Sequence, residues 1–410
     1  MHLRAWLATM GLCVFCLGSP GNRTLQGGEI PRFVELEVEK DFGVGYAVAI
    51  ADINRDQRPD IVAINPTQAV WFENPSWKRH VMIDGQTRKD NVCLAIHDID
   101  ADGRLDLALG AEWMPTNTQS GGTLQWLQQP KNLEQSWPLF PIGSEPTLHR
   151  IRWGDFDGDG RSELVVAPLQ GRGTKGPDWS QGDGVRLLIY HPPEMPRSQP
   201  WRQEVVDQSL HSLHNVFVTN FDTDPEDEII AASLEGVTLF DRKVDGTWTK
   251  RLIGEGNDDP ETLPGAGEIK MGRFRSGRRY LATVEPWHGH QIVTYLPDPD
   301  ASQELWQRQP LEGHLRQAHA LACADVDGDG DDELIAGWRE APPSGRFGIA
   351  LYDPQDGEWR QVRKFLVDDG GMATEDLAVA DLNGDGRPDI VAVGRATHNV
   401  KIYFNSGARP

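Results

Sequence analysis

Residues 155–167 read DFDGDGRSELVVA: three aspartates at alternate positions, a glycine, a fourth acid and an apolar run. Six further segments share this arrangement. They begin at Asp52, Asp98, Asn220, Asp325 and Asp381, and in degenerate form at Gly272. Successive copies start 46 to 65 residues apart. A repeat of this length, built from short apolar runs and turns, is typical of one four-stranded propeller blade. The sequence therefore predicts an all-β protein, a seven-bladed β-propeller.

Aromatic residues recur at two further places in the repeat. One stands in the predicted third strand of every copy, and a tryptophan opens the predicted fourth strand of six copies. The third-strand residues are Trp71, Trp126, Tyr190, Phe240, Tyr295, Tyr352 and Tyr403, and the fourth-strand residues are Trp77, Trp137, Trp201, Trp248, Trp306 and Trp359. We expect these rings to form the core between blades.

The last copy ends near Tyr403 without room for a fourth strand. Residues 31–38 resemble the other fourth strands, with Phe33 in the place of the tryptophan. We therefore expect the N-terminal strand to complete the last blade and close the ring, which leaves only short, protected strand edges. Length alone would suggest two or three domains, but this arrangement predicts one propeller over residues 19–410.

The acidic segments have the spacing of metal-binding loops. Oxygens at positions 1, 3 and 5 of a tight turn can converge on one hard cation, with a further acid at position 9, and several carboxylates favour Ca²⁺. The candidate ligands are Asp52, Asn54, Asp56 and Asp60; Asp98, Asp100, Asp102 and Asp106; Asp155, Asp157, Asp159 and Glu163; Asp325, Asp327, Asp329 and Glu333; and Asp381, Asn383, Asp385 and Asp389. The alternative is a set of solvated acidic turns, but the closely spaced charges would repel one another without a cation.

An EF-hand is the obvious rival for this spacing. It requires a bidentate acid at position 12 between two helices. Position 12 is instead Leu109, Val166, Ala336 or Ala392, and the flanking segments have the composition of strands. The loops are therefore expected to join two strands.

These loops resemble the FG-GAP or VCBS repeats of integrin-α-type β-propellers, and the resemblance extends over nearly the whole chain. It implies calcium as a structural element, with the function elsewhere. Some copies depart from the pattern. Gln57 replaces the glycine of the first loop, Asn220 and Pro225 weaken the fourth, and Arg273 and Arg275 replace acids in the Gly272 copy. We expect no calcium in that last loop.

A second recurring position in the repeat is predicted to lie on the opposite face of the ring. The residue six positions before each loop should lie at the mouth of the central channel. These residues are Tyr46, Val92, His149, His214, Ala266, His319 and Glu375. Three histidines and a carboxylate suit Zn²⁺, Mn²⁺ or Fe²⁺. It stays open at this point whether a single ion can reach all four, because they come from blades 3, 4, 6 and 7.

Other polar and aromatic residues are predicted on the same face, in the loops between second and third strands. They are Glu112, Trp113, Trp287, His288, His290, Trp338, Arg339, Glu340, Arg395 and His398. Such a mixture around a concave mouth suits a sugar. The insertion at residues 169–183 also belongs there, either as a flexible lid or as a surface excursion.

The histidine ring is similar to the propeller portion of aldos-2-ulose dehydratase-type lyases, which carry a metal at the channel mouth. That resemblance implies a metal-assisted elimination on a carbohydrate, with His288 or His290 as the base. The additional cupin domains of those enzymes have no counterpart in this sequence, which leaves the substrate open. The alternative is a non-catalytic adhesion or scaffold propeller that binds a glycan or a protein. The chain has no G-x-S-x-G, HExxH or phosphate-binding glycine loop, which argues against serine hydrolase, zincin and nucleotide chemistry.

Charge and the N-terminus limit the remaining possibilities. The chain has 40 basic and 62 acidic residues, a net charge of −22, so a nucleic acid is not an expected partner. Arg4 and the apolar run at residues 5–17 are typical of a signal peptide, and the run is too short to span a bilayer. We expect residues 1–18 to be removed and the protein to be secreted or periplasmic, with no membrane span. A lipoprotein signal would use Cys16, but the bulky Phe15 before it argues against this. Cys93 and Cys323 are not expected to form a disulfide.

Overall fold

The computed structural model describes residues 31–222, 224–298, 304–343 and 345–407. The predicted signal peptide therefore lies outside the described residues. Within these ranges the chain forms 28 strands, grouped in seven sheets of four strands each, and no helix. None of this part of the chain can therefore cross a bilayer as a helix.

The first six sheets follow one another in chain order, and each is a meander of four consecutive strands. The first three are formed by β2 (Ala47–Ala51), β3 (Asp60–Ile64), β4 (Gln68–Glu73) and β5 (Lys78–Asp84); β6 (Cys93–His97), β7 (Asp106–Ala111), β8 (Thr123–Leu127) and β9 (Leu139–Ser144); and β10 (Leu148–Gly154), β11 (Glu163–Pro168), β12 (Leu187–His191) and β13 (Arg202–Asp207). The next three are β14 (Asn215–Thr219), β15 (Glu228–Ser233), β16 (Gly236–Arg242) and β17 (Trp248–Gly254); β18 (Glu268–Arg273), β19 (Arg279–Glu285), β20 (Gln291–Leu296) and β21 (Gln307–Glu312); and β22 (Ala318–Ala324), β23 (Glu333–Trp338), β24 (Gly348–Pro354) and β25 (Val362–Asp369).

The seventh sheet contains both ends of the described chain. It holds β26 (Thr374–Ala380), β27 (Asp389–Gly394), β28 (Val400–Asn405) and β1 (Phe33–Glu39). β1 pairs antiparallel with β28, from Phe33 opposite Asn405 to Glu39 opposite Val400. Phe33 packs against the apolar cluster shared with the sixth sheet, and Val38 against the cluster shared with the first.

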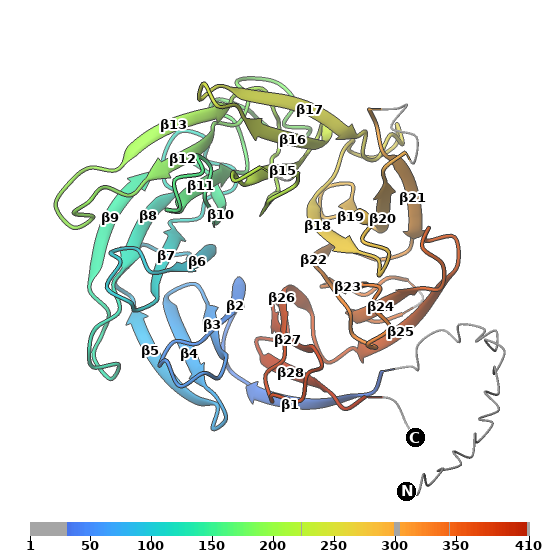
Figure 1. The fold of residues 1–410 in the computed structure, drawn as a ribbon, viewed down its shortest axis with the longest axis horizontal. Coiled ribbons are helices and arrows are strands. Elements are labelled where there is room, and N and C mark those ends of the chain that lie inside the picture. Colours follow the sequence, from blue (N-terminus) through green and yellow to red (C-terminus); the bar gives the residue numbers. More distant parts are fainter. Residues whose placement is uncertain (1–30, 223, 299–303, 344, 408–410) are drawn as a thin grey trace, which may run out of the picture.

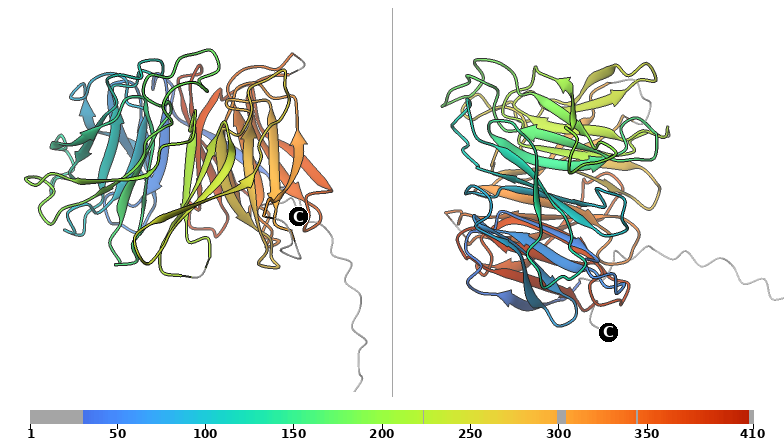
Figure 2. Two further views of the ribbon diagram at one scale, coloured as in Figure 1. Left: turned by 90° about the horizontal axis from the view of Figure 1, so that it is seen from above. Right: turned by 90° about the vertical axis from the view of Figure 1, so that its left-hand side faces the viewer.

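The sheets stand around a central axis as the blades of a seven-bladed β-propeller (Figure 1). The first strand of each blade is innermost, and each inner strand contacts the inner strand of the next blade, including β26 against β2. Figure 2 shows the ring from the side, with the strands crossing its thickness and the connecting loops on its two faces. The predicted all-β, seven-bladed fold is confirmed.

The core lies between neighbouring blades. The second strands, such as β3 and β23, are buried along their whole length, because each is covered by a blade on both sides. This explains why they are continuous apolar runs after the first acid. The seven third-strand aromatics are at most 1% exposed, as the sequence predicts. Cys93 and Cys323 are free thiols.

We predict that removal of residues 31–39 abolishes soluble monomeric protein. The deletion exposes the full edge of β28 and removes Phe33 and Val38 from two interblade clusters, and an unpaired apolar edge is a template for aggregation. Size-exclusion chromatography and thermal unfolding measure the effect. A monomeric deletion variant with an unchanged melting temperature would show that β1 is dispensable, and deletion of residues 1–18 is the control that should change nothing.

Candidate functional site

The acidic loops share one backbone arrangement at the ends of the inner strands. The carboxylate at position 1 accepts a hydrogen bond from the backbone N–H at position 6 in five loops. The N···O distances are 2.9 Å for Asp52 and Gln57, 2.8 Å for Asp98 and Gly103, 2.8 Å for Asp155 and Gly160, 3.1 Å for Asp325 and Gly330, and 2.7 Å for Asp381 and Gly386. The five predicted loops therefore have the same local geometry.

Gln57 keeps this geometry although it replaces a glycine. Its φ is 69°, close to the 83° of Gly103 at the equivalent position of the next loop. Position 6 thus requires the left-handed conformation that glycine adopts without strain. The first loop pays a small conformational cost but presents its carboxylates as the others do.

The acid at position 9 opens the second strand and is buried. It accepts the backbone N–H of position 2, as in the contacts of Asp60 with Ile53 at 2.9 Å and of Asp106 with Ile99 at 3.2 Å. The same bond joins Glu163 to Phe156 at 3.1 Å. This acid therefore shapes the loop as well as offering a ligand oxygen.

Several carboxylate oxygens in these loops are buried without a hydrogen-bond partner. They are Asp100 Oδ1, Asp157 Oδ1, Asp327 Oδ2, Glu228 Oε1 and Glu333 Oε1. Within the described part of the chain, no carboxylate outside the acidic loops has such an oxygen. A buried carboxylate oxygen without a partner is costly. These oxygens fit the ligands of a hard cation, at positions 3 and 9 of the loop.

The pKa values of the loop acids also indicate that these carboxylates lack a positively charged partner. Burial, and after it the neighbouring Asp327 carboxylate, raise the pKa of Glu333 to about 9. Burial likewise raises the pKa of Asp106 and of Glu163 to about 7. A bound cation would favour the ionised form of these groups. Asp102 and Asp385 also form close ion pairs with Arg104 and Arg387, so a cation there would replace an arginine partner.

The fourth loop also brings its acids together, although its sequence departs from the pattern. Asp222, Asp224 and Glu228 have ligand atoms within 4.8 Å of one another, as do Asp98, Asp100 and Asp106, and Asp155, Asp157 and Asp159. The first of these groups belongs to the fourth loop, where Asn220 and Pro225 depart from the pattern. Its signal was the retention of acids at positions 3, 5 and 9. His191 also lies with Asp157 and Glu163 in such a group, and its sequence position gave no sign of this.

The degenerate loop of the fifth blade docks on its neighbour instead. The backbone N–H of Arg273 donates to Asp332 and that of Arg275 to Asp331, both at 2.8 Å. The Arg275 guanidinium lies 3.7 Å from Asp331. The guanidinium of Arg275 thus lies in a loop whose equivalents in the other blades carry acidic side chains.

The predicted histidines meet at the opposite ends of the inner strands. His149 lies in β10, His214 precedes β14 and His319 lies in β22, so all three are on the face away from the acidic loops. One ring nitrogen from each lies within 4.8 Å of the other two. The edges of a tetrahedron with zinc–nitrogen bonds of 2.1 Å measure about 3.4 Å, so nitrogens within 4.8 Å of one another lie near the spacing that a single ion would need.

Hydrogen bonds set the same tautomer in all three rings. Nδ1 of His149 lies 2.8 Å from the carbonyl oxygen of His214, Nδ1 of His214 3.1 Å from that of Gly267, and Nδ1 of His319 2.6 Å from that of Glu375. A carbonyl oxygen only accepts, so each Nδ1 carries the proton. Each Nε2 therefore presents a lone pair, the arrangement that prepares an imidazole for a metal.

Burial keeps these histidines neutral. It lowers the pKa of His149 and His319 well below the usual value, and the nearby Arg150 and Arg339 lower it further. Burial also lowers the pKa of His214. Only neutral imidazole binds a metal, so the environment fits that role.

His288 joins the cluster from the loop after β19. Its Nε2 lies 2.8 Å from Nε2 of His214, and Arg339 donates to its Nδ1 at 3.2 Å. Arg150 donates to Nε2 of His149 at 3.0 Å. Metal binding would replace the hydrogen bonds that His214 and His149 accept at Nε2. The φ of His288 is 47°, a left-handed conformation that costs about 1–3 kcal/mol in a non-glycine residue and is frequent at functional sites.

Glu375 lies beside the three histidines but has other partners. Its Oε2 accepts from Arg339 at 2.6 Å and its Oε1 from Arg395 at 2.8 Å, whereas Nε2 of His319 is 4.0 Å from Oε1. The structure therefore groups three histidines, while two guanidinium groups hold the predicted fourth ligand. The sequence placed Arg339 and Arg395 on this face without showing that they would pair with Glu375.

A small cavity of about 130 Å³ opens beside the cluster. Its walls include Tyr46, Trp113, Trp287, His288 and Arg339. The ring of Trp113 stacks on His149 with centroids 4.9 Å apart. His290 does not line this cavity; its ring lies near Gln291, 3.4 Å away. Of the two candidate bases, only His288 is at the site.

Comparison with known proteins agrees with this architecture. Residues 121–298 match the model of the aldos-2-ulose dehydratase beta-propeller domain, and residues 52–109 and 325–392 match the FG-GAP-like repeat. Both resemblances expected from the sequence are confirmed. The chain is also similar to aldos-2-ulose dehydratase of Phanerodontia chrysosporium, at 27% identity over 390 residues, with 88% of this chain and 41% of that protein covered. The chain thus spans about two fifths of the length of this relative.

Two solved structures share the fold. They are crystals of BBS1N in complex with ARL6DN, soaked with mercury or with lead, with TM-scores of 0.55 and 0.53. In both, 92% of this chain and 97% of the other chain are covered at 12% identity. At that identity the likeness shows the propeller fold alone.

We predict that chelation of calcium destabilises the folded protein reversibly. A cation that binds only the folded chain stabilises it by RT ln(1 + [L]/Kd). At saturation of several loops, excess EDTA should lower the melting temperature by more than about 10 °C. Differential scanning calorimetry with and without added CaCl₂ measures this. An unchanged transition in EDTA would rule out calcium as a structural element.

Two single substitutions test whether the stabilisation by calcium comes from the intact acidic loops. Asp155→Ala removes a position-1 ligand and should lower the melting temperature in calcium by about 3 °C. Arg273→Ala, in the degenerate loop, should change neither the melting temperature nor the number of bound calcium ions. Equal effects of the two changes would contradict the assignment of the loops.

Proposed function

We propose that this protein is a calcium-stabilised propeller that binds a divalent transition metal at His149, His214 and His319 and catalyses an elimination on a carbohydrate. The observation that carries the proposal is the shared tautomer of the three histidines, whose Nδ1 atoms donate to carbonyl oxygens of the following blades. A structural histidine needs one satisfied nitrogen. Three such rings, with one nitrogen of each within 4.8 Å of one nitrogen of the other two, have an arrangement that suits a shared ligand.

The metal fits these residues as Zn²⁺, Mn²⁺ or Fe²⁺, which accept neutral imidazole. When bound, such an ion supplies Lewis acidity that polarises a carbonyl or carboxylate oxygen and acidifies the neighbouring C–H bond. Three histidine ligands would leave room at such an ion for a substrate oxygen, as in catalytic zinc sites. Glu375 is assigned a positioning role here, because Arg339 and Arg395 hold both of its oxygens.

His288 is the proposed proton acceptor. Burial lowers its pKa well below the usual value, and the neighbouring His214 and Arg339 lower it further, so the ring is neutral at physiological pH. Its Nε2 carries the proton shared with His214, so Nδ1 would take the proton from the carbon next to the carbonyl, after Arg339 turns from this nitrogen to a substrate oxygen. The electron pair of that C–H bond forms a carbon–carbon double bond as the β-hydroxyl departs. The leaving hydroxyl would take up one proton, from the His288 imidazolium or from solvent, and depart as water, so the reaction is a dehydration.

The other cavity residues suit a sugar. Trp113 and Trp287 offer aromatic faces to the apolar side of a pyranose ring, and Arg339 and Arg395 offer donors to oxygens. The relationship to a protein named aldos-2-ulose dehydratase supports a carbohydrate substrate and a dehydration. The match to its propeller model over residues 121–298 includes His149, His214 and His288.

We infer that the protein acts outside the cytoplasm. The proposed signal peptide at residues 1–18 would direct export, and calcium is plentiful outside cells, where modules with dissociation constants of about 10⁻⁴–10⁻³ M are occupied. Cys93 and Cys323 are free thiols and form no disulfide with each other. In this proposal, bound cations cross-link the fold instead.

We predict that wild-type protein carries one transition-metal equivalent in addition to calcium. The variant His149→Ala/His214→Ala should lose that equivalent and keep its calcium, because the acidic loops lie on the other face. Inductively coupled plasma mass spectrometry of both proteins measures the two metals together. If the wild type carries calcium alone, the lyase proposal fails and a propeller that binds a glycan or protein without catalysis takes its place.

We predict that wild-type protein forms an unsaturated, ultraviolet-absorbing product from keto- or uronic-sugar substrates. His288→Gln should lower kcat by about 10²–10⁴-fold, the usual contribution of a general base, and leave the metal content unchanged. His290→Gln is the matched control, because this histidine lies outside the cavity, and should retain activity. Equal activity of the two variants would exclude His288 as the base. A wild type that holds its metal but gives no product from the sugar panel would indicate a ligand-binding site without catalysis.

A further inference from the structure

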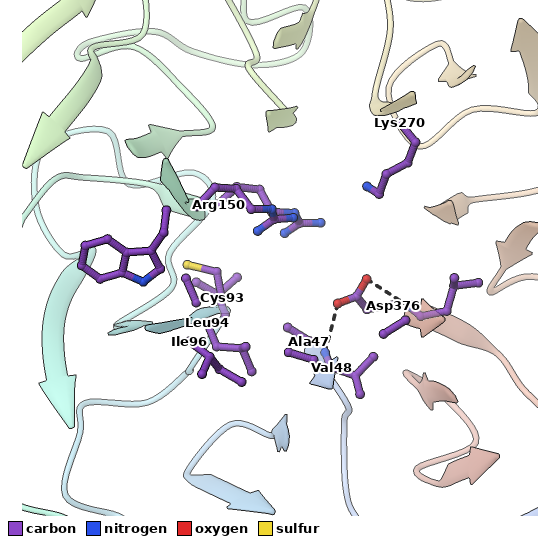
Figure 3. A pocket seen from close by; sticks show the side chains of 15 residues that line it. Ala47, Val48, Cys93, Leu94, Ile96, Arg150, Lys270 and Asp376 are labelled. Carbon is purple, nitrogen blue, oxygen red and sulfur yellow. Dashed lines mark hydrogen bonds between the residues drawn. The ribbon is translucent and has the colours of Figure 1, made fainter. Parts of the chain in front are cut away.

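A second, larger cavity lies in the central channel beneath the histidine cluster. Its volume is about 400 Å³, and its walls come from the inner strands β2, β6, β10, β18 and β26. Figure 3 shows the side chains of Arg150, Lys270 and Asp376 directed into the space between these strands. The channel is therefore hollow below the site already described, and charged groups face the hollow.

Positive charge predominates on the walls. Arg150 and Arg152 of β10 and Lys270 of β18 line the cavity, together with one carboxylate, that of Asp376. The remaining lining residues are apolar or aromatic, such as Cys93, Leu94 and Ile96. The whole chain has a net charge of −22, so a basic interior is the opposite of what its composition would produce by chance.

The carboxylates near the cavity do not balance these cations. Glu268 is shared, with Oε1 at 3.5 Å from Arg150 and Oε2 at 3.7 Å from Lys270. Asp376 accepts backbone N–H groups from Val48 and Leu377, both at 3.0 Å. Three cations and two carboxylates leave one positive charge in excess.

Arg152 is the cation with the poorest partners. Its guanidinium donates to the carbonyl oxygen of Ile151 at 2.7 Å and reaches Asn215 Oδ1 at 3.5 Å. Among the residues described by the structure, no carboxylate lies within 4.0 Å of it. A guanidinium has five N–H donors in a planar fork that matches an oxyanion. Most of the donors of Arg152 thus remain available to a ligand in the cavity.

We propose that this channel cavity binds a small oxyanion, of the carboxylate or sulfate type, with Arg152 and Lys270 as its principal ligands and Arg150 at its upper end. Arg152 and Lys270 are half-buried, a charge that is partly removed from water is costly unless it is paired, and an anion supplies the missing partner. The same charges disfavour a metal cation. Arg150 also borders the smaller cavity beside the histidines, so the two sites share one residue but not their ligand chemistry.

The test is isothermal titration of sulfate into the full-length, metal-loaded protein at constant ionic strength. Wild type should bind one sulfate. Arg152→Met and Lys270→Met should each raise the Kd at least tenfold, whereas Lys175→Met, which removes an equal charge from an exposed loop, should leave it unchanged. Arg152→Lys keeps the charge and should retain weaker binding, which guards against variants that fail to fold.

A second readout uses stability. Without sulfate, Arg152→Met should melt at or above the wild-type temperature, because it removes an uncompensated charge, and the rise in melting temperature on adding sulfate should be smaller than in the wild type. Absence of saturable sulfate binding, or equal binding by Arg152→Met and Lys175→Met, would overturn the proposal.

The source of the anion can be distinguished in the same assay. Acetate and glucuronate present the same carboxylate with and without a sugar. Tighter, Arg152-dependent binding of glucuronate would identify the site as one for sugar acids, and equal binding would identify it as one for free oxyanions. Sulfate binding that persists in His149→Ala/His214→Ala would show that the site does not depend on the proposed metal.

Discussion

The hydrogen bond between the second residue of each acidic loop and the carboxylate that opens the next strand is the interaction on which this architecture depends. It buries an acid such as Asp60 or Glu163 at the start of a core strand. It also fixes a turn in which acids such as Asp155, Asp157 and Asp159 bring ligand atoms within 4.8 Å of one another. The resulting repulsion and the partnerless oxygens can be relieved by a cation. We therefore propose that stability and metal binding are linked on one face of the ring.

This arrangement leaves the other ends of the inner strands free for a site. There the blades contribute His149, His214 and His319, whose Nδ1 atoms donate to backbone carbonyls and whose rings each have one nitrogen within 4.8 Å of the others. Arginines surround this cluster, and more cations line the channel below it. A strongly acidic protein thus encloses an axis of neutral donors and positive charge, which suits an oxygen-rich, acidic or carbonyl-bearing ligand.

The repeat made the fold predictable, because each copy encodes a loop, a buried strand and an interblade aromatic. The six-residue offset also found the histidines, since a common register places equivalent residues at equivalent heights. The ion pairs between side chains of different blades around the channel were not predictable from the sequence. Arg339 and Arg395 hold Glu375, and Arg150 meets Glu268, through side-chain conformations that no spacing specifies. Loop geometry likewise separated His288 from His290, two residues apart in the chain, and brought Asp222, Asp224 and Glu228 together despite an imperfect motif.

The central claim is that three imidazoles hold a metal at the channel mouth, separately from the calcium loops. X-ray absorption at the edge of the transition metal in purified protein tests it most directly, because calcium does not contribute there. The account predicts imidazole scattering with about three nitrogen ligands at roughly 2.0–2.1 Å for zinc, and its disappearance in His149→Ala/His214→Ala. A first shell of oxygen alone, or a spectrum that is unchanged in this variant, would contradict it.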